Sequence, residues 1–297
     1  MNFDDNLKKR AQLFEASLQK FCAAQDASIP PRLREAMNYS LEAGGKRLRP
    51  VLCMAGAELF GTAGEAVFPL ALALEMVHTA SLIHDDLPCM DNDSLRRGKP
   101  TNHKVFGETL ALLAGDSLFL YAFDVALSGL SDAGFEWKRT ERALALFARA
   151  LGPAGICGGQ VLDTDLQSQS HDRDFVKHIA SMKTMVLIRA AVGSGALLAG
   201  ADDEDLSSVM SYGEKAGLAF QISDDILDCI GTQEKMGKTL GKDRSQHKRT
   251  FVSAYGLEGA RAMLESLTLE ACAHLERFGE KAEFLRSLAL ELENRSN

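Results

Sequence analysis

Two clusters of aspartates are the residues of this sequence best suited to chemistry. Each brings three carboxylates together at the end of an apolar stretch: Asp85, Asp86 and Asp91 in DDLPCMD, and Asp224, Asp225 and Asp228 in DDILD. Two like charges about 4 Å apart repel by roughly 1 kcal/mol in water and roughly 4 kcal/mol near a protein surface, so this clustering is costly without a cation. Because only hard, oxygen-preferring ions suit an all-carboxylate set, the clusters predict Mg²⁺ bound together with substrate phosphates.

A solvated acidic helix end is the alternative interpretation of either cluster. Negative charge at the C-terminus of a helix is unfavourable to the helix dipole, so Asp85 and Asp86 lie where structure alone would not favour them. The second cluster is surrounded by the apolar residues Phe220, Ile222, Ile226 and Leu227 rather than by a polar surface. We therefore interpret both clusters as metal ligands.

Periodicity places both clusters on helices. Apolar residues recur at three- and four-residue steps over 65–87, and Pro88 ends the pattern just after Asp85. Within a second long helix over 203–230, the side chains of Gln221, Asp224, Asp225 and Asp228 share one face. Further helices are expected at about 4–24, 32–43, 50–60, 105–129, 137–151, 153–166, 172–199, 256–277 and 280–294.

Composition favours a fold made almost entirely of helices. The 297 residues are 46% hydrophobic but only 7% aromatic, and seven are prolines. We find no repeat, low-complexity tract or linker that would divide the chain. The sequence therefore predicts one all-α domain over residues 1–297, a bundle of about 10 to 13 helices.

Charge and cysteine content exclude several classes of partner. The formal net charge of −8 argues against nucleic-acid binding, because a broad basic face is lacking. Six cysteines without C-x-x-C spacing indicate reduced thiols, and no apolar leader follows the first residues, so a cytoplasmic location is expected. The apolar stretch 185–200 is shorter than a bilayer and contains Arg189, so we expect a buried helix and no membrane span.

Three basic features accompany the clusters. LRRGKPTNHK, residues 95–104, either balances the nearby aspartates or binds diphosphate, since adjacent guanidinium groups grip phosphate oxygens bidentately. GGKRLRP, residues 44–50, offers further cations before a helix that has a proline in its first turn. Lys183 and Thr184 interrupt an apolar helix, and a buried lysine needs an anionic partner. His78 is either a satisfied core histidine or a site residue, since it lies seven residues before Asp85 and faces the same way.

Together these motifs resemble the trans-prenyl diphosphate synthases, the family that makes farnesyl or geranylgeranyl diphosphate. The similarity runs from about residue 40 to residue 256. In family order it includes GGKRLRP, SLIHDDLPCMDNDSLRRGKPTNH, GICGGQVLD, the Lys-Thr pair, FQISDDILD and GKTLGKD. The resemblance implies an all-helical fold around a deep central cavity, with the two clusters facing each other at its mouth, and a homodimer.

The resemblance also implies a role for each site residue. Three Mg²⁺ ions, for which Mn²⁺ would substitute, would be held by Asp85, Asp91 and Asp224, with Asp86, Asp225 and Asp228 assisting directly or through water. The allylic diphosphate would be bound by Arg96, Lys183, Lys238 and Lys248, and isopentenyl diphosphate by Lys46, Arg49, His78 and Arg97. Thr184 and Gln221 would lie near the reacting carbon, where their dipoles stabilise positive charge.

The implied reaction is the head-to-tail addition of isopentenyl diphosphate to dimethylallyl, geranyl or farnesyl diphosphate. Departing pyrophosphate leaves an allylic cation, which the isopentenyl double bond attacks in a dry cavity. We expect the released pyrophosphate to accept the proton, because no side chain advertises that role. Met185, Ser94 and Val252 depart from the family pattern without removing a ligand.

Product length should depend on the residues below Asp85, because a chain growing along the helix advances about 1.5 Å per residue. Leu74, His78 and Ser81 lie on the Asp85 side, and Val77 and Ala80 flank them. Family members that stop at fifteen carbons often have an aromatic residue at the Ala80 position, so this chain resembles those that make twenty. Leu74, Leu118 or Phe119 could close the pocket sooner, and both lengths stay open.

Two other classes of protein share part of this pattern. A class I terpene cyclase would use the aspartates but not the basic residues Lys46, Arg49 and Arg97. A noncatalytic regulatory subunit would have lost one cluster, whereas both are whole here.

Overall fold

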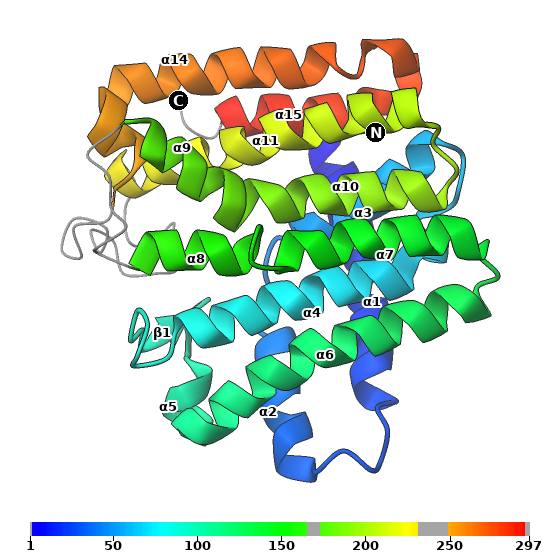
Figure 1. The fold of residues 1–297 in the computed structure, drawn as a ribbon, viewed down its shortest axis with the longest axis vertical. Helices are drawn as coiled ribbons and strands as arrows, with labels where there is room; N and C mark the ends of the chain where they lie inside the picture. The colour runs from blue at the N-terminus through cyan, green and yellow to red at the C-terminus, as the bar shows by residue number, and fades with distance from the viewer. Residues whose placement is uncertain (1, 165–172, 231–248, 295–297) are drawn as a thin grey trace.

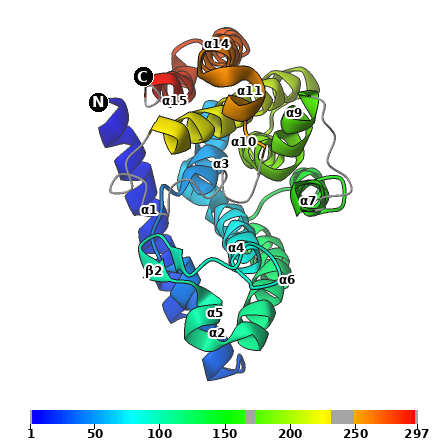
Figure 2. The ribbon, with the colours of Figure 1, turned by 90° about the vertical axis from the view of Figure 1, so that its left-hand side faces the viewer.

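The computed structural model describes residues 2–164, 173–230 and 249–294. Within these ranges the chain is an all-α bundle, as predicted. Most of its long helices lie side by side, one above another in Figure 1, and Figure 2 shows the bundle from its side. The helices are α1 (Phe3–Ala23), α2 (Pro31–Leu41), α3 (Leu48–Leu59), α4 (Phe68–Asp85), α5 (Asn102–Phe106), α6 (Glu108–Asp132), α7 (Trp137–Leu151), α8 (Ile156–Thr164), α9 (Asp174–Ala180), α10 (Val186–Leu198), α11 (Asp203–Ile230), α14 (Phe251–Ala273) and α15 (Glu283–Asn294). Three short turns complete the list: η1 (Gly64–Val67), η2 (Ser181–Met185) and η3 (Glu276–Ala282).

Helix α4 is the central rod that carries the first aspartate cluster. It is apolar nearly all round because α3, α6 and α2 pack against it, and it has Pro69 in its first turn. Its last residue is Asp85, and Asp86 is its C-cap. The buried α4 therefore places Asp85 and Asp86 at its C-terminal end, where a polar loop begins.

Helix α11 carries the second cluster on a 28-residue rod. Its buried residues pack against α10 and α14, and Gln221, Asp224, Asp225 and Asp228 all lie in its last three turns. Helix α14 starts beside this cluster with a capping box, in which Thr250 and Ser253 satisfy each other's backbone N–H groups.

The helix expected over 172–199 contains a π-helical turn, η2, between α9 and α10. Lys183 and Thr184 lie in this wider turn, a feature often found at functional sites. Glycines allow neighbouring helices to approach it closely. A Cβ on Gly159 of α8 would lie 2.5 Å from the backbone nitrogen of Lys183. A Cβ on Gly217 of α11 would lie 2.8 Å from the Met185 Cα.

Other boundaries differ from the sequence prediction where glycine or a cap intervenes. The helix expected over 105–129 is divided into α5 and α6 at Gly107, whose φ is +85°. Helix α14 begins at residue 251 rather than at 256, because Thr250 caps it and Gly256 only kinks it. Residues 95–100 form a small hairpin of β1 (Leu95–Arg96) and β2 (Lys99–Pro100).

Three described segments are long and apolar enough to cross a membrane. For Gly64–Asp85 and Asp174–Leu198, 67% of the most apolar window is buried inside the protein, which explains their hydropathy by core packing. The stretch 185–200 is accordingly a buried helix, as expected. For Glu108–Asp132, which is α6, only 33% of the window is buried. One apolar face of α6 thus lacks a partner within the described chain.

Candidate active site

The first cluster occupies the turn that follows α4. The Asp91 backbone N–H donates to the Asp85 carbonyl over 2.8 Å, which folds the DDLPCMD loop back onto the helix end. The Asp85 carboxylate is partly exposed and lies 4.0 Å from the Lys183 ammonium of η2. Asp85 therefore faces η2.

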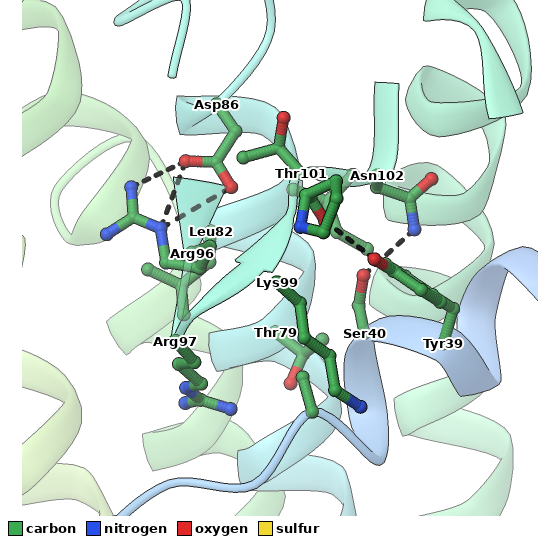
Figure 3. Close-up of a pocket in the computed structure, with 13 residues that line it drawn as sticks. Tyr39, Ser40, Thr79, Leu82, Asp86, Arg96, Arg97, Lys99, Thr101 and Asn102 are labelled. Carbon is green, nitrogen blue, oxygen red and sulfur yellow. Dashed lines mark hydrogen bonds and ion pairs between the residues drawn. The ribbon is translucent and has the colours of Figure 1, made fainter. Parts of the chain in front are cut away.

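The Asp86 carboxylate is bound by Arg96 of the following hairpin. Asp86 is only 3% exposed. Its carboxylate accepts hydrogen bonds from Arg96 Nε at 3.0 Å and from Arg96 Nη2 at 2.5 Å (Figure 3). Burial raises the pKa of Asp86, and Arg96 opposes that rise. Burial alone would lower the pKa of Arg96, but Asp86, Asp85 and Asp91 bring it above its ordinary value. Arg96 thus couples Asp86 electrostatically to Asp85 and Asp91.

The hairpin that carries the arginines is fixed to α2. Tyr39 donates its hydroxyl to the Pro100 carbonyl at 2.8 Å, and Asn102 donates to Ser40 Oγ at 2.8 Å (Figure 3). The same residues line a small pocket that is also bordered by the Asp86–Arg96 pair. They also fix where Arg96 and its neighbour Arg97 can point.

The second cluster is organised by a chain of hydrogen bonds. Thr184 donates to Gln221 Oε1 at 2.7 Å, and Gln221 Nε2 donates to Asp225 Oδ1 at 2.8 Å. The other Asp225 oxygen accepts the Phe251 backbone N–H at 2.7 Å. Asp225 thus links η2, α11 and the start of α14, whereas Asp224 and Asp228 are partly exposed on the same helix. The predicted grouping of Thr184 with Gln221 is present.

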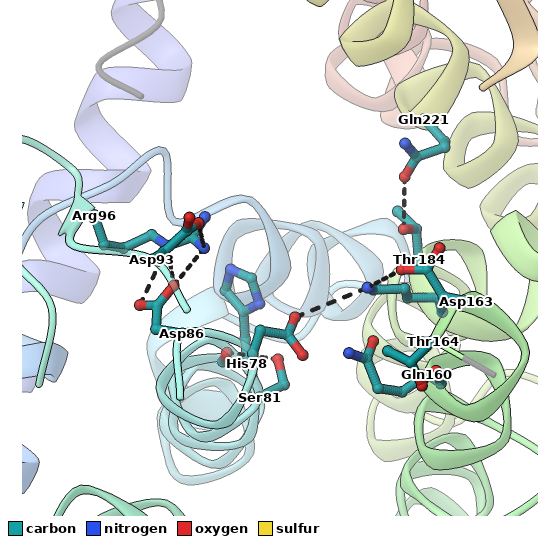
Figure 4. Close-up of polar contacts among 12 residues, drawn as sticks. His78, Ser81, Asp86, Asp93, Arg96, Gln160, Asp163, Thr164, Thr184 and Gln221 are labelled. Atoms are coloured by element: carbon teal, nitrogen blue, oxygen red, sulfur yellow. Dashed lines mark hydrogen bonds and ion pairs between the residues drawn. The ribbon is translucent and has the colours of Figure 1, made fainter. Parts of the chain in front are cut away.

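Lys183, whose side chain is 25% exposed, has the anionic partner that the sequence predicts for it. Its ammonium lies 2.6 Å from Asp163 Oδ2, in α8, as well as 4.0 Å from Asp85 (Figure 4). Asp163 is the last residue of the GICGGQVLD segment. A lysine within an apolar helix indicates a nearby anion, but the sequence pattern does not identify which one.

The basic segment before α3 converges with the hairpin. Arg97 adopts a positive φ of 54° and donates to the Gly44 carbonyl. Gly45 has a φ of +135°, which residues with a Cβ rarely adopt, and a Cβ there would also lie 2.8 Å from the Arg97 guanidinium. Lys46 extends toward α11, with its ammonium 6.0 Å from the centre of the Phe220 ring.

Burial strongly perturbs the charges of this basic region. It lowers the pKa of Arg49 to about 10, and Glu75 is the leading opposing influence. Burial also lowers the pKa of Arg97. The pKa of His78 lies well below its usual value, because of burial first and the positive charges of Arg49 and Arg97 next. His78 is therefore a neutral hydrogen-bonding group at pH 7, beside cations suited to an anionic ligand.

The predicted product-length residues differ in their accessibility. Ser81 is partly exposed and donates its hydroxyl to the His78 carbonyl at 2.8 Å. Leu74, Val77 and Ala80 have no exposed surface. A chain that reached these three would have to move neighbouring side chains aside.

Metal binding fits the donor chemistry but needs more ligands than the described protein offers. No three His, Cys, Asp or Glu side chains within residues 2–164, 173–230 and 249–294 converge to hold an ion. Oxygen atoms of a diphosphate would supply the missing ligands, as is usual for Mg²⁺. Lys238 and Lys248 lie outside the described residues.

The chain is similar in sequence and in fold to known proteins. The family described as polyprenyl synthetase matches residues 30–286. A dimethylallyltranstransferase of Fischerella ambigua is 46% identical over 97% of this chain and 82% of its own length, and a geranylgeranyl diphosphate synthase of Cyanophora paradoxa is 43% identical over 98% and 96%. A geranyltransferase from Helicobacter pylori, solved with magnesium and isoprenyl diphosphate, has a TM-score of 0.83 and 31% identity over 99% of this chain and 97% of that one.

Proposed function

Because this chain belongs to the polyprenyl synthetase family, we propose that it is a short-chain trans-prenyl diphosphate synthase. It joins isopentenyl diphosphate head-to-tail to dimethylallyl, geranyl or farnesyl diphosphate, gives farnesyl or geranylgeranyl diphosphate, and releases pyrophosphate. One observation carries the proposal: the acidic ends of α4 and α11 are both connected to η2. Lys183 lies 4.0 Å from Asp85, and Thr184 donates to Gln221 at 2.7 Å.

The allylic side of the reaction uses this acidic arrangement. Bound Mg²⁺, three ions by family resemblance, would neutralise the diphosphate as it departs. Asp85, Asp91 and Asp224 are the residues that would hold it. Lys183 lies between Asp163 and Asp85, where it can donate to the same diphosphate, and Thr184 and Gln221 present oxygen dipoles near the carbon that becomes positive.

The basic side of the site distinguishes elongation from cyclisation. Arg49 and Arg97 are partly buried and lie beside the neutral His78, so they offer a second diphosphate its own binding place. A terpene cyclase binds a single diphosphate and would have no use for these cations. After attack by the isopentenyl double bond, a proton must leave the new chain, and we propose that the released pyrophosphate accepts it.

A homodimer accounts for the exposed face of α6. The large apolar side chains on this face are Leu112, Leu113, Leu120 and Leu127, and Leu120 is 75% exposed. Asp116 and Asp124 are exposed on the same helix, which disfavours contact with a lipid interior. We therefore propose a second copy of the chain as the partner, and L120D should give a monomer in sedimentation measurements.

A cytoplasmic location belongs to the same proposal. All six cysteines are free thiols in the structure, and three of them, Cys89, Cys157 and Cys229, are exposed. Such thiols persist in a reducing compartment.

The decisive experiment is turnover by the purified protein alone. With Mg²⁺, isopentenyl diphosphate and each allylic substrate in turn, we expect pyrophosphate release and a product of fifteen or twenty carbons on chromatography. Ionisation of the allylic substrate without consumption of isopentenyl diphosphate would instead indicate a cyclase. Activity that appears only with another subunit would indicate a regulatory protein.

A further inference from the structure

Glu75 is a buried carboxylate that the reaction as described leaves unused. It lies on α4 ten residues before Asp85 and is only 1% exposed. An ionised carboxylate is expensive to bury unless cations and hydrogen bonds compensate it. The groups that surround Glu75 therefore indicate why it is there.

Arg47 is the closest of these groups. It is 3% exposed, has a left-handed backbone conformation before α3, and donates Nη1 to Glu75 Oε1 at 2.7 Å. Its Nε donates to Glu15 of α1 at 2.8 Å, and its Nη2 to the Leu41 carbonyl at 2.8 Å. Burial would lower the pKa of Arg47, but Glu15 and Glu75 bring it above its ordinary value. Arg47 therefore stays charged, and its hydrogen bonds link the segment before α3 to α1, to the end of α2 and to α4.

Glu75 also reaches the second basic segment. The Arg97 Nη2 atom lies 3.9 Å from Glu75 Oε1, and Arg97 Nη1 donates to the Gly44 carbonyl. One carboxylate therefore contacts the GGKRLRP segment through Arg47 and the hairpin through Arg97. Gly44 and Arg97 are 53 residues apart in sequence, so this junction joins two distant segments.

The charges around this junction would otherwise repel one another. Arg49 and Arg97 each lower the pKa of the nearby His78, and Arg97 lowers that of Arg49. Glu75 is the leading opposing influence on the pKa of both arginines. Glu75 is thus the largest negative influence on these guanidinium groups, with smaller ones from Asp224 on Arg49 and from Glu15 on Arg97.

We propose that Glu75 is a positioning residue that assembles Arg49 and Arg97 into a diphosphate receptor before the substrate arrives, acting through Arg47. The identity of the ligand, isopentenyl diphosphate, rests on the proposed function. The receptor is then rigid when the anion binds, so little binding energy is lost in ordering flexible cations.

Simple charge compensation makes the opposite prediction. If Glu75 served only to offset positive charge, the variant E75Q would leave the site more positive and bind diphosphate more tightly. If Glu75 positions the arginines, E75Q should weaken binding, because the bond from Arg47 loses its charged acceptor and Arg97 loses its ionic partner. Such losses correspond to about a 10-fold change or more in affinity.

The test compares E75Q with the control E58Q. Glu58 of α3 pairs with Arg10 of α1, so it also joins α1 to α3 by a carboxylate and an arginine, but away from the substrate cations. We expect E75Q to raise the KM for isopentenyl diphosphate about 10-fold, with kcat and the KM for the allylic substrate within about 3-fold of the wild type. The control should change thermal stability only. An unchanged or lower KM in a folded E75Q variant would overturn the proposal.

Binding measurements separate this inference from the function itself. Calorimetry of metal-free protein with inorganic pyrophosphate should show weaker binding for E75Q, and also for R47K, which keeps the charge but loses the planar fork. If the wild type turned over no substrate while E75Q still weakened pyrophosphate binding, the function would fail and the positioning role would stand. If turnover were normal and neither variant changed pyrophosphate affinity, the positioning role would fail alone.

Discussion

The ion pair between Lys183 and Asp163 should control how easily Asp85 binds magnesium. The lysine ammonium lies 2.6 Å from Asp163 and 4.0 Å from Asp85. At an effective dielectric constant of about 20, these distances correspond to attractions of about 6 and about 4 kcal/mol. Because all three side chains are partly exposed, the net preference of Lys183 for Asp163 is about 1 to 2 kcal/mol after screening.

The variant D163N removes this preference with almost no change in shape. Lys183 is then free to move onto Asp85, and Mg²⁺ must displace it before the carboxylate can serve as a ligand. We expect the Mg²⁺ concentration for half-maximal turnover to rise about 5- to 30-fold, which is the same 1 to 2 kcal/mol expressed as an equilibrium. Saturating Mg²⁺ should recover most of the lost rate.

The assay is pyrophosphate release measured against Mg²⁺ concentration at fixed, saturating substrates. D174N is the matched control, since Asp174 pairs with Lys177 at 3.0 Å on the exposed surface of α9 and makes the same chemical change away from the aspartate clusters. A D163N enzyme with normal Mg²⁺ dependence would refute the reasoning, because Lys183 would then have no influence on the ligand.

Three further outcomes follow from the same structure. D85A and D224A should each lower turnover by orders of magnitude while the helical circular dichroism stays intact, and near-normal turnover in either would contradict the metal assignment. A80Y should shorten the product seen by chromatography, since a tyrosine ring at this buried position leaves no room for a longer chain; an unchanged product would mean that Ala80 does not border the growing chain. Because burial keeps His78 uncharged in the folded state, the unfolded chain binds more protons below the ordinary histidine pKa, and stability should fall as the pH drops through that range. The free energy of unfolding, measured by chemical denaturation between pH 7 and pH 5, should fall less in H78Q than in the wild type. An identical pH dependence in the two proteins would count against a buried, neutral His78.

Local patterns in the sequence were sufficient for the helices that carry the chemistry. The spacing of apolar residues placed Asp85 at the end of α4 and the second cluster in the last turns of α11, and both positions agree with the structure. Lys183 was expected to have an anionic partner, and it has one. These features depend on residues within a few helical turns, so periodicity and the cost of burial predict them.

Tertiary packing alone decided which charged groups meet. Asp163 is twenty residues from Lys183, Glu75 is 28 residues from Arg47, and Glu15 is 32 residues from Arg47. The chain contains 41 acidic and 33 basic side chains, so composition allows many pairings that local periodicity cannot rank. Close approach of α8 and α11 to η2 at two glycines, and of α1 and α3 to α4 around Arg47, selects among them. The sequence by itself predicts the carboxylates of the site, and the packing of helices determines which cation lies beside each carboxylate.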